Sequence, residues 1–108
     1  MDWIPLQTEE QLTELNERSK QRPQLLFKHS TRCPVSAMVK NRLYKTELPD
    51  TIDFYYLDLI AYRAISNKIA ANYGVRHESP QVLLIKDGNC IYHESHSGVF
   101  MEDVIAHA

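Results

Sequence analysis

The sequence predicts one α/β domain in which helices flank a mixed four-stranded sheet, in the order α-β-α-β-α-β-β-α. Short apolar runs of strand length alternate with helical patterns, and the last two runs are joined by a tight turn at Asp87-Gly88. A length of 108 residues suits a single hydrophobic core. We therefore expect residues 1–108 to form one domain, whose first strand-helix-strand unit is parallel and right-handed.

The first helix is predicted over residues 9–20. Thr8 and Gln11 form a capping-box pattern, in which the Thr8 hydroxyl accepts from a backbone amide and Gln11 reaches back to the N-cap. Pro23 ends this segment. Residues 24–29 then form a short, mostly apolar run, which is typical of a strand buried on both faces.

Pro34 marks the start of the second helix, because the first turn tolerates a residue without an N–H group. Apolar residues continue at intervals to about residue 47. The aromatic and aliphatic run 52–58 is too short for a globular helix and predicts the second strand. Residues 61–73 predict the third helix, since apolar residues recur every four positions and Gly74 can close it.

Two more strands and a short helix complete the predicted domain. Residues 81–85 and 90–95 flank the Asp87-Gly88 turn and are expected to pair as a hairpin. Residues 100–106 carry one apolar stripe, which indicates a final helix. The hairpin therefore adds antiparallel strands to the parallel pair.

Composition argues against several partners. The formal net charge is −2, and the basic residues are scattered, so we expect neither nucleic acid nor a membrane surface as a partner. No apolar run approaches the roughly 20 residues that span a bilayer, and the N-terminus lacks a signal-peptide pattern, so we expect a cytoplasmic location. The two cysteines are too few for a disulfide framework and are expected to be free thiols.

Cys33 lies between the first predicted strand and the second helix, in a Cys-Pro-Val-Ser motif at 33–36. At a helix N-terminus, a sulfur faces unpaired backbone N–H groups and the positive end of the helix dipole, and both favour the thiolate. Arg32 adds a permanent charge if its side chain points the same way. The alternative, a small apolar filler, is disfavoured by the polar residues that precede it.

The motif contains only one thiol. Ser36 stands where a dithiol oxidoreductase carries its second cysteine, and its hydroxyl either bonds the thiolate or simply belongs to the first helical turn. Cys90 is expected roughly 15 Å from Cys33, whereas the Cα atoms of a disulfide lie within about 7 Å. We therefore predict that Cys33 acts alone and that Cys90 is a packed strand residue.

Two other chemical interpretations fit poorly. Cys90, His93 and His96 have a CxxHxxH spacing, but strand residues three apart point to opposite faces, so we predict no metal site. A phosphatase-like cysteine loop needs an arginine six positions after the cysteine, and Val39 stands there. Phosphoryl chemistry is therefore not supported.

The element order, the cysteine at the strand-helix junction and Ser79-Pro80 before the third strand together resemble the thioredoxin fold. The likeness covers nearly the whole chain. It implies that the Ser79-Pro80 bond is a candidate cis peptide and that its loop faces the thiol and presents backbone to an extended substrate. Arg76 and His77 before this loop, and His96 and Gly98 after the fourth strand, could line a substrate groove or simply be solvated surface.

A closer resemblance rests on the segments HSTRCPVS, LDLIAYRAISNKIAANYGVRHESPQVLLIKDG and HESHSG. They look like the YtxJ family, the monothiol bacilliredoxins of bacteria that use bacillithiol, over most of residues 24–98. Members usually have threonine before the cysteine, where this chain has Arg32. The departure leaves the nucleophile intact and changes the charge beside it.

This resemblance implies that Cys33 removes bacillithiol from mixed disulfides on cytosolic proteins, with bacillithiol as thiol co-substrate and no other cofactor. A second thiol or a reducing partner then frees Cys33. Arg32 and Arg76 could bind the malate carboxylates of bacillithiol. Supporting roles are implied for the other motif residues, Pro34, Ser36, Ser79 and Pro80.

Two alternatives remain open at this point. One is a non-catalytic thioredoxin-like module that binds a protein partner beside Pro80. The other is a redox sensor in which a small thiol caps Cys33 without turnover. Turnover distinguishes both from a bacilliredoxin.

Overall fold

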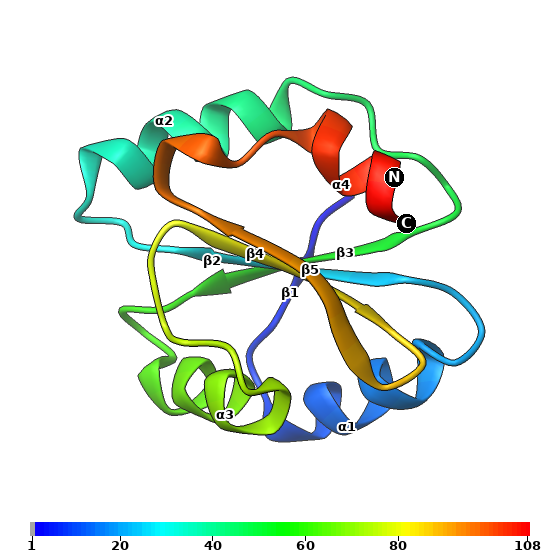
Figure 1. Cartoon of the computed structure of the whole chain (residues 1–108). Coiled ribbons are helices and arrows are strands. Elements are labelled where there is room, and N and C mark those ends of the chain that lie inside the picture. Colours follow the sequence, from blue (N-terminus) through cyan, green and yellow to red (C-terminus); the bar gives the residue numbers. More distant parts are fainter. Residues whose placement is uncertain (1) are drawn as a thin grey trace.

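The structure is a computed structural model that describes residues 2–108. Helices cover both faces of a central sheet, with α2 and α4 on one face and α1 and α3 on the other (Figure 1). The helices are α1 (Glu9–Arg18), α2 (Pro34–Tyr44), α3 (Arg63–Tyr73) and α4 (Met101–His107), and η1 (His96–Gly98) is a 3-10 turn. The strands are β1 (Ile4–Pro5), β2 (Gln24–His29), β3 (Asp53–Asp58), β4 (Gln81–Lys86) and β5 (Asn89–Ser95).

The sheet is mixed, as the sequence predicts, and has the strand order β1-β3-β2-β4-β5. Strand β2 pairs in parallel with β3 and antiparallel with β4, which in turn pairs antiparallel with β5. The predicted count of four strands is wrong, because β1 adds a fifth strand parallel to β3 at the edge of the sheet. A two-residue strand that contains a proline has no periodic pattern from which to predict it.

The predicted helices are present, with small differences at their ends. Helices α1 and α2 end two and three residues earlier than predicted, and α3 begins two residues later, at Arg63. The capping box of Thr8 and Gln11 is formed. Gly74 ends α3 with a φ of 64°, a left-handed conformation that glycine adopts without strain.

Strand β2 is buried along its whole length, as predicted. Its side chains alternate between two apolar clusters. Leu26 belongs to the cluster that α1 and α3 build with Leu15 and Ile69, whereas Leu25 and Phe27 belong to the cluster on the α2 side. Each fully buried side chain of this size contributes about 1.5–3 kcal/mol to stability. The two clusters fix both the position and the register of β2.

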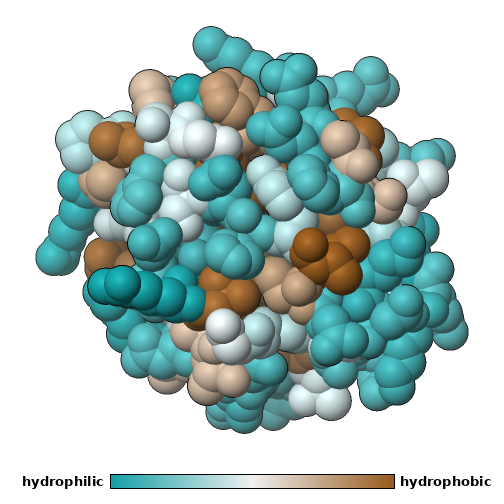
Figure 2. All heavy atoms as spheres, viewed as in Figure 1, coloured by the Kyte–Doolittle hydropathy of each residue, from teal (hydrophilic) through white to brown (hydrophobic). Residues whose placement is uncertain are grey.

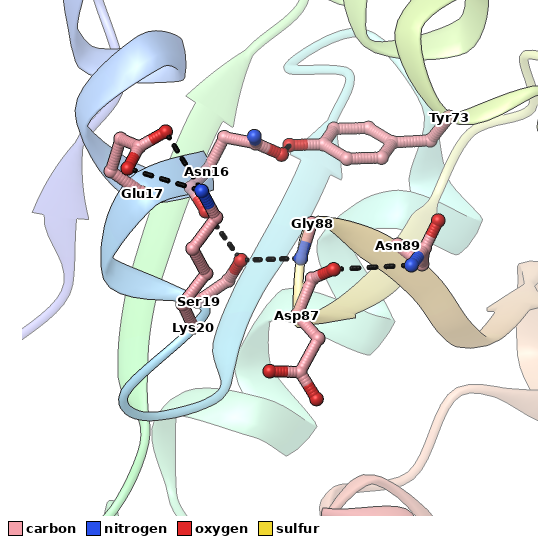
Figure 3. Close-up of polar contacts among 8 residues, drawn as sticks. All are labelled: Asn16, Glu17, Ser19, Lys20, Tyr73, Asp87, Gly88 and Asn89. Carbon is pink, nitrogen blue, oxygen red and sulfur yellow. Dashed lines mark hydrogen bonds and ion pairs between the residues drawn. The ribbon is translucent and has the colours of Figure 1, made fainter.

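Hydrogen bonds fix the β4–β5 turn against the end of α1 (Figure 3). Asp87 and Gly88 have φ angles of 53° and 76°, as the predicted tight turn requires. The Gly88 N–H donates to Ser19 Oγ (2.9 Å), and the Asp87 N–H donates to the Ser19 carbonyl (2.8 Å). The Tyr73 hydroxyl donates to Asn16 Oδ1 (2.9 Å), which joins α3 to the same helix.

The surface is mainly hydrophilic on the face drawn in Figure 2, where apolar groups are scattered. Val35 and Met38 are exposed apolar residues of α2, close to its first turn. Within residues 2–108, no helix combines the length and the apolar character needed to cross a membrane.

Candidate functional site

Three segments meet at one end of the sheet: the β2–α2 loop, the loop before β4, and η1 (Figure 1). The antiparallel register of β2 and β4 sets Pro80 beside the end of β2. The His96 N–H donates to the Pro80 carbonyl (2.7 Å), which joins η1 to the second loop. Arg42 of α2 donates to the carbonyls of Ser97 (2.9 Å) and Val99 (2.8 Å), so η1 is tied to α2 as well.

Cys33 is the N-cap residue of α2, and its side chain makes no capping hydrogen bond. Its extended backbone (φ −105°, ψ 119°) lets the Cys33 carbonyl accept the Ala37 N–H (3.0 Å), the first bond of the helix, while Pro34 occupies the first turn. The residue is partly exposed. This exposure argues against the interpretation of Cys33 as a buried apolar filler.

Ser36 is fully buried, and its hydroxyl bonds groups other than the cysteine. Ser36 Oγ accepts the Ser30 N–H (3.0 Å) and lies 2.6 Å from His29 Nδ1. With Oγ accepting from the amide, the hydroxyl proton can be donated to Nδ1 of a neutral imidazole. The sequence left open whether Ser36 bonds the thiolate, and the structure gives it a buried structural bond instead.

His29 is a buried histidine that the sequence did not single out. Its ring lies 5.7 Å from that of Tyr56, between β2 and α2. Burial and then the charge of Lys40 lower the pKa of His29 below 6.5, and smaller contributions from Ser36 and Asp58 oppose them. The neutral imidazole therefore predominates at pH 7, which suits an Nδ1 that accepts from Ser36.

On the other face of the sheet, Lys28 forms a polar cluster with the buried Ser66 and the half-buried His77. The Lys28 side chain is fully buried, and its Nζ donates to the Ser66 carbonyl (3.2 Å) and lies 3.3 Å from His77 Nδ1. Ser66 Oγ lies 3.1 Å from the same nitrogen. Burial lowers the pKa of Lys28 to about 8, so the ammonium form predominates at neutral pH.

The Ser79–Pro80 peptide bond is cis, the form that the thioredoxin resemblance implied. Pro80 is buried and Ser79 is half-buried. Arg76 of the same loop is exposed at the surface, and Gln81 Nε2 donates to its carbonyl (3.0 Å).

The remaining predicted residues lie around these loops. Arg32 is exposed in the β2–α2 loop. His96 is exposed at the start of η1 with a φ of 59°, and its Nε2 lies 4.0 Å from a Glu78 oxygen. Gly98 ends η1, and a side chain there would meet Glu94 at 3.2 Å, so glycine lets η1 pack closely against that residue. The structure thus brings the predicted residues to one end of the sheet.

Cys90 lies elsewhere. It pairs with Ile85 in the β4–β5 ladder, four residues along β4 from Gln81, or about 13 Å from the end of the sheet that carries the site. Its side chain packs against the α1–α3 cluster. Burial raises the pKa of the Cys90 thiol, which makes it a weak nucleophile.

Comparisons with known proteins agree with the fold. The sequence matches the family of monothiol bacilliredoxin BrxC over residues 4–104. A solved structure of a candidate oxidoreductase with a thioredoxin fold is 29% identical, with a TM-score of 0.81, and the match covers 95% of this chain and 89% of that one. Fasciola hepatica thioredoxin is 21% identical, with a TM-score of 0.74 and coverage of 97% and 99%. Malassezia sympodialis thioredoxin is 15% identical, with a TM-score of 0.79 and coverage of 98% and 90%. The thioredoxin-like α/β fold predicted from the sequence is therefore confirmed.

Proposed function

This chain belongs to the monothiol bacilliredoxin BrxC family and has a thiol redox function, and we propose that this function is the removal of bacillithiol from protein mixed disulfides through Cys33. One observation carries the proposal: Cys33 is partly exposed at the mouth of α2, whereas the hydroxyl of Ser36 is buried and bonded to His29. Such a site supports a mixed disulfide with an outside thiol and offers no second sulfur within the motif.

The proposed reaction has two exchange steps. In the first, the Cys33 thiolate attacks the bacillithiol sulfur of a mixed disulfide, a bond forms between these two sulfurs, and the target cysteine leaves as a thiolate. In the second, an outside thiolate attacks the bacillithiol sulfur held on Cys33, and Cys33 leaves as a thiolate. Each step breaks one S–S bond and forms one, so no further oxidant or cofactor is needed.

Two exposed cations support the choice of bacillithiol. Arg32 precedes the thiol, and Arg76 lies in the loop that ends at Pro80. Bacillithiol carries malate carboxylates, and guanidinium groups bind carboxylates through paired hydrogen bonds. We assign Arg32 and Arg76 to these carboxylates, and replacing both by alanine should weaken bacillithiol binding without removing the nucleophile.

The test uses a protein that carries one bacillithiol mixed disulfide, with a small outside thiol as reductant. Wild type is expected to release bacillithiol, first as its mixed disulfide with the outside thiol and then, after a second exchange with excess outside thiol, as the free thiol. Mass spectrometry detects both products. Cys33→Ala should release none above the uncatalysed rate. Cys90→Ala is the matched control, because it removes the other thiol at a position far from the site, and it should retain wild-type activity.

Without the outside thiol, intact-mass measurement should find one bacillithiol on wild type and on Cys90→Ala. Capture without release when the reductant is added would indicate a redox sensor. Neither capture nor release would indicate a non-catalytic binding module. Either result, or an inactive Cys90→Ala, would contradict the proposal.

A further inference from the structure

The cluster of Lys28, Ser66 and His77 takes no part in the exchange steps above. It lies on the α3 face of the sheet, whereas α2 and its first turn lie on the other. His77 belongs to the loop that ends at Pro80, three residues further on. The cluster thus joins this loop to the interior of the sheet.

We propose that Lys28, Ser66 and His77 are positioning residues that fix the loop before β4 in the conformation that binds a protein substrate. The inference rests on the proposed function, because it concerns how the same site receives the protein that carries the mixed disulfide. It assigns no chemical step to the cluster.

The strength of the anchor follows from the charge of Lys28. None of the ion pairs formed among residues 2–108 includes this fully buried ammonium group. A buried charge without a counterion depends on its hydrogen bonds, and bonds from a charged donor are about twice as strong as neutral ones. The bonds from Lys28 to the Ser66 carbonyl and to His77 are therefore costly to break.

The loop is fixed at two consecutive residues. His77 is bound through its ring, and Arg76 is bound through its carbonyl, which accepts from the buried Gln81 side chain (3.0 Å). Gln81 lies directly opposite Lys28 in the β2–β4 register. Both anchors thus start from neighbouring positions of the sheet, and the short segment from Glu78 to Pro80 has little freedom to move.

The arrangement requires a neutral His77, because Nδ1 must accept. The groups that face the ring are Lys28 from β2, Ser66 and Arg63 from α3, and Glu78 from the loop. Burial, and then the charges of Lys28 and Arg63, lower the pKa of His77, and only Glu78 raises it. An imidazolium would meet the ammonium group at hydrogen-bond distance, so acid should release the loop.

The test compares His77→Ala with His77→Asn, both in a Cys90→Ala background. Asparagine keeps an acceptor near the position of Nδ1 but does not titrate, whereas alanine removes the acceptor. His77→Ala is expected to raise the KM for a bacillithiolated protein about tenfold, while the rate at which iodoacetamide alkylates Cys33 stays within about twofold of wild type. His77→Asn should keep the wild-type KM at pH 7 and lack the rise in KM that we expect for wild type in acid.

Amide hydrogen exchange in the loop gives a readout that does not depend on turnover. His77→Ala should accelerate exchange at residues 76–79 about tenfold, and His77→Asn should not. Unchanged exchange in His77→Ala would overturn the anchor. Faster exchange with an unchanged KM would overturn the link to substrate binding. A rise in KM matched by an equal fall in the alkylation rate of Cys33 would overturn it as well. A wild type that releases no bacillithiol would contradict the proposed function, while the exchange comparison would still decide whether the cluster fixes the loop.

Discussion

Lys28→Met tests the most unusual feature of the fold, a fully buried lysine that forms no ion pair with any carboxylate of residues 2–108. Methionine has a similar length and fills the same space without a charge. Burial lowers the pKa of Lys28 from 10.5 to about 8. Between pH 8 and pH 10.5 the unfolded chain binds more protons at this residue than the folded chain does, so the free energy of unfolding of wild type should rise with pH.

The magnitude follows from the two pKa values. One pKa unit corresponds to about 1.4 kcal/mol, so the folded state gains about 3 kcal/mol between pH 7 and full deprotonation above pH 10.5. The gain is absent well below pH 8, where both states carry the charge. Because the side chain is fully buried, solvent does not screen this effect. Lys28→Met lacks the titrating group and should show no such rise.

Other groups titrate in the same range with the opposite sign. Burial raises the pKa values of Tyr44 and Tyr73 to about 12 and that of the Cys90 thiol, so their contributions fall as pH rises. These contributions are shared by wild type and Lys28→Met and cancel in the difference between them. That difference is the quantity to measure.

The assay is urea unfolding followed by circular dichroism, in reducing buffer, at intervals from pH 7 to 10. The free energy of unfolding of wild type minus that of Lys28→Met should increase by about 2 to 3 kcal/mol across this range. A difference that stays constant with pH would refute the argument, because it would mean that Lys28 titrates alike in the folded and unfolded chains.

Three further substitutions test local features. Thr8→Ala removes the capping box and should lower the free energy of unfolding by about 1 kcal/mol, whereas Thr13→Ala, at an exposed position within α1, should not lower it; urea unfolding compares the two. Ser36→Ala leaves the Ser30 amide and the His29 ring without their buried partner and should cost about 2 kcal/mol, and a thermal melt unchanged from wild type would contradict this hydrogen-bond assignment. Gly88→Ala places a side chain at a φ of 76° with no atom closer than 3.7 Å, so backbone strain alone should cost about 1 kcal/mol in the same assay, and a loss well above this would indicate a steric clash instead.

The sequence predicts most of the fold because the signals are local. The capping box of Thr8 and the closing Gly74 lie within a few residues of the helix ends that they fix, and strands β2, β3 and β4 each form a largely apolar run. Strand β1 and the turn η1 were not predicted, because two or three residues cannot show a period. Their conformations depend on partners far along the chain.

The site shows the same contrast between residues marked by a local motif, which could be predicted, and residues brought together from distant parts of the chain, which could not. Cys33 and Pro80 could be identified because each lies in a short motif at a predicted junction. Lys28 was treated as part of an apolar strand, and its partners Ser66 and His77 lie 38 and 49 residues away. A charged residue within a strand buried on both faces was the available signal, because such a group needs polar partners that only the folded chain can supply.

The alternation of β2 explains why its last two residues, which are both polar, bind different parts of the site. Lys28 points to the same face of the sheet as Leu26, toward α3. His29 points to the same face as Phe27, toward α2. His29 therefore fixes the first turn of the helix that Cys33 begins, and Lys28 fixes the loop that ends at Pro80. A one-residue slip of β2 would reverse both faces and would bury each polar group against apolar side chains. Because such a slip is so costly, β2 keeps the register that completes the core. The same register places the β2–α2 loop and the loop before β4 at one end of the sheet.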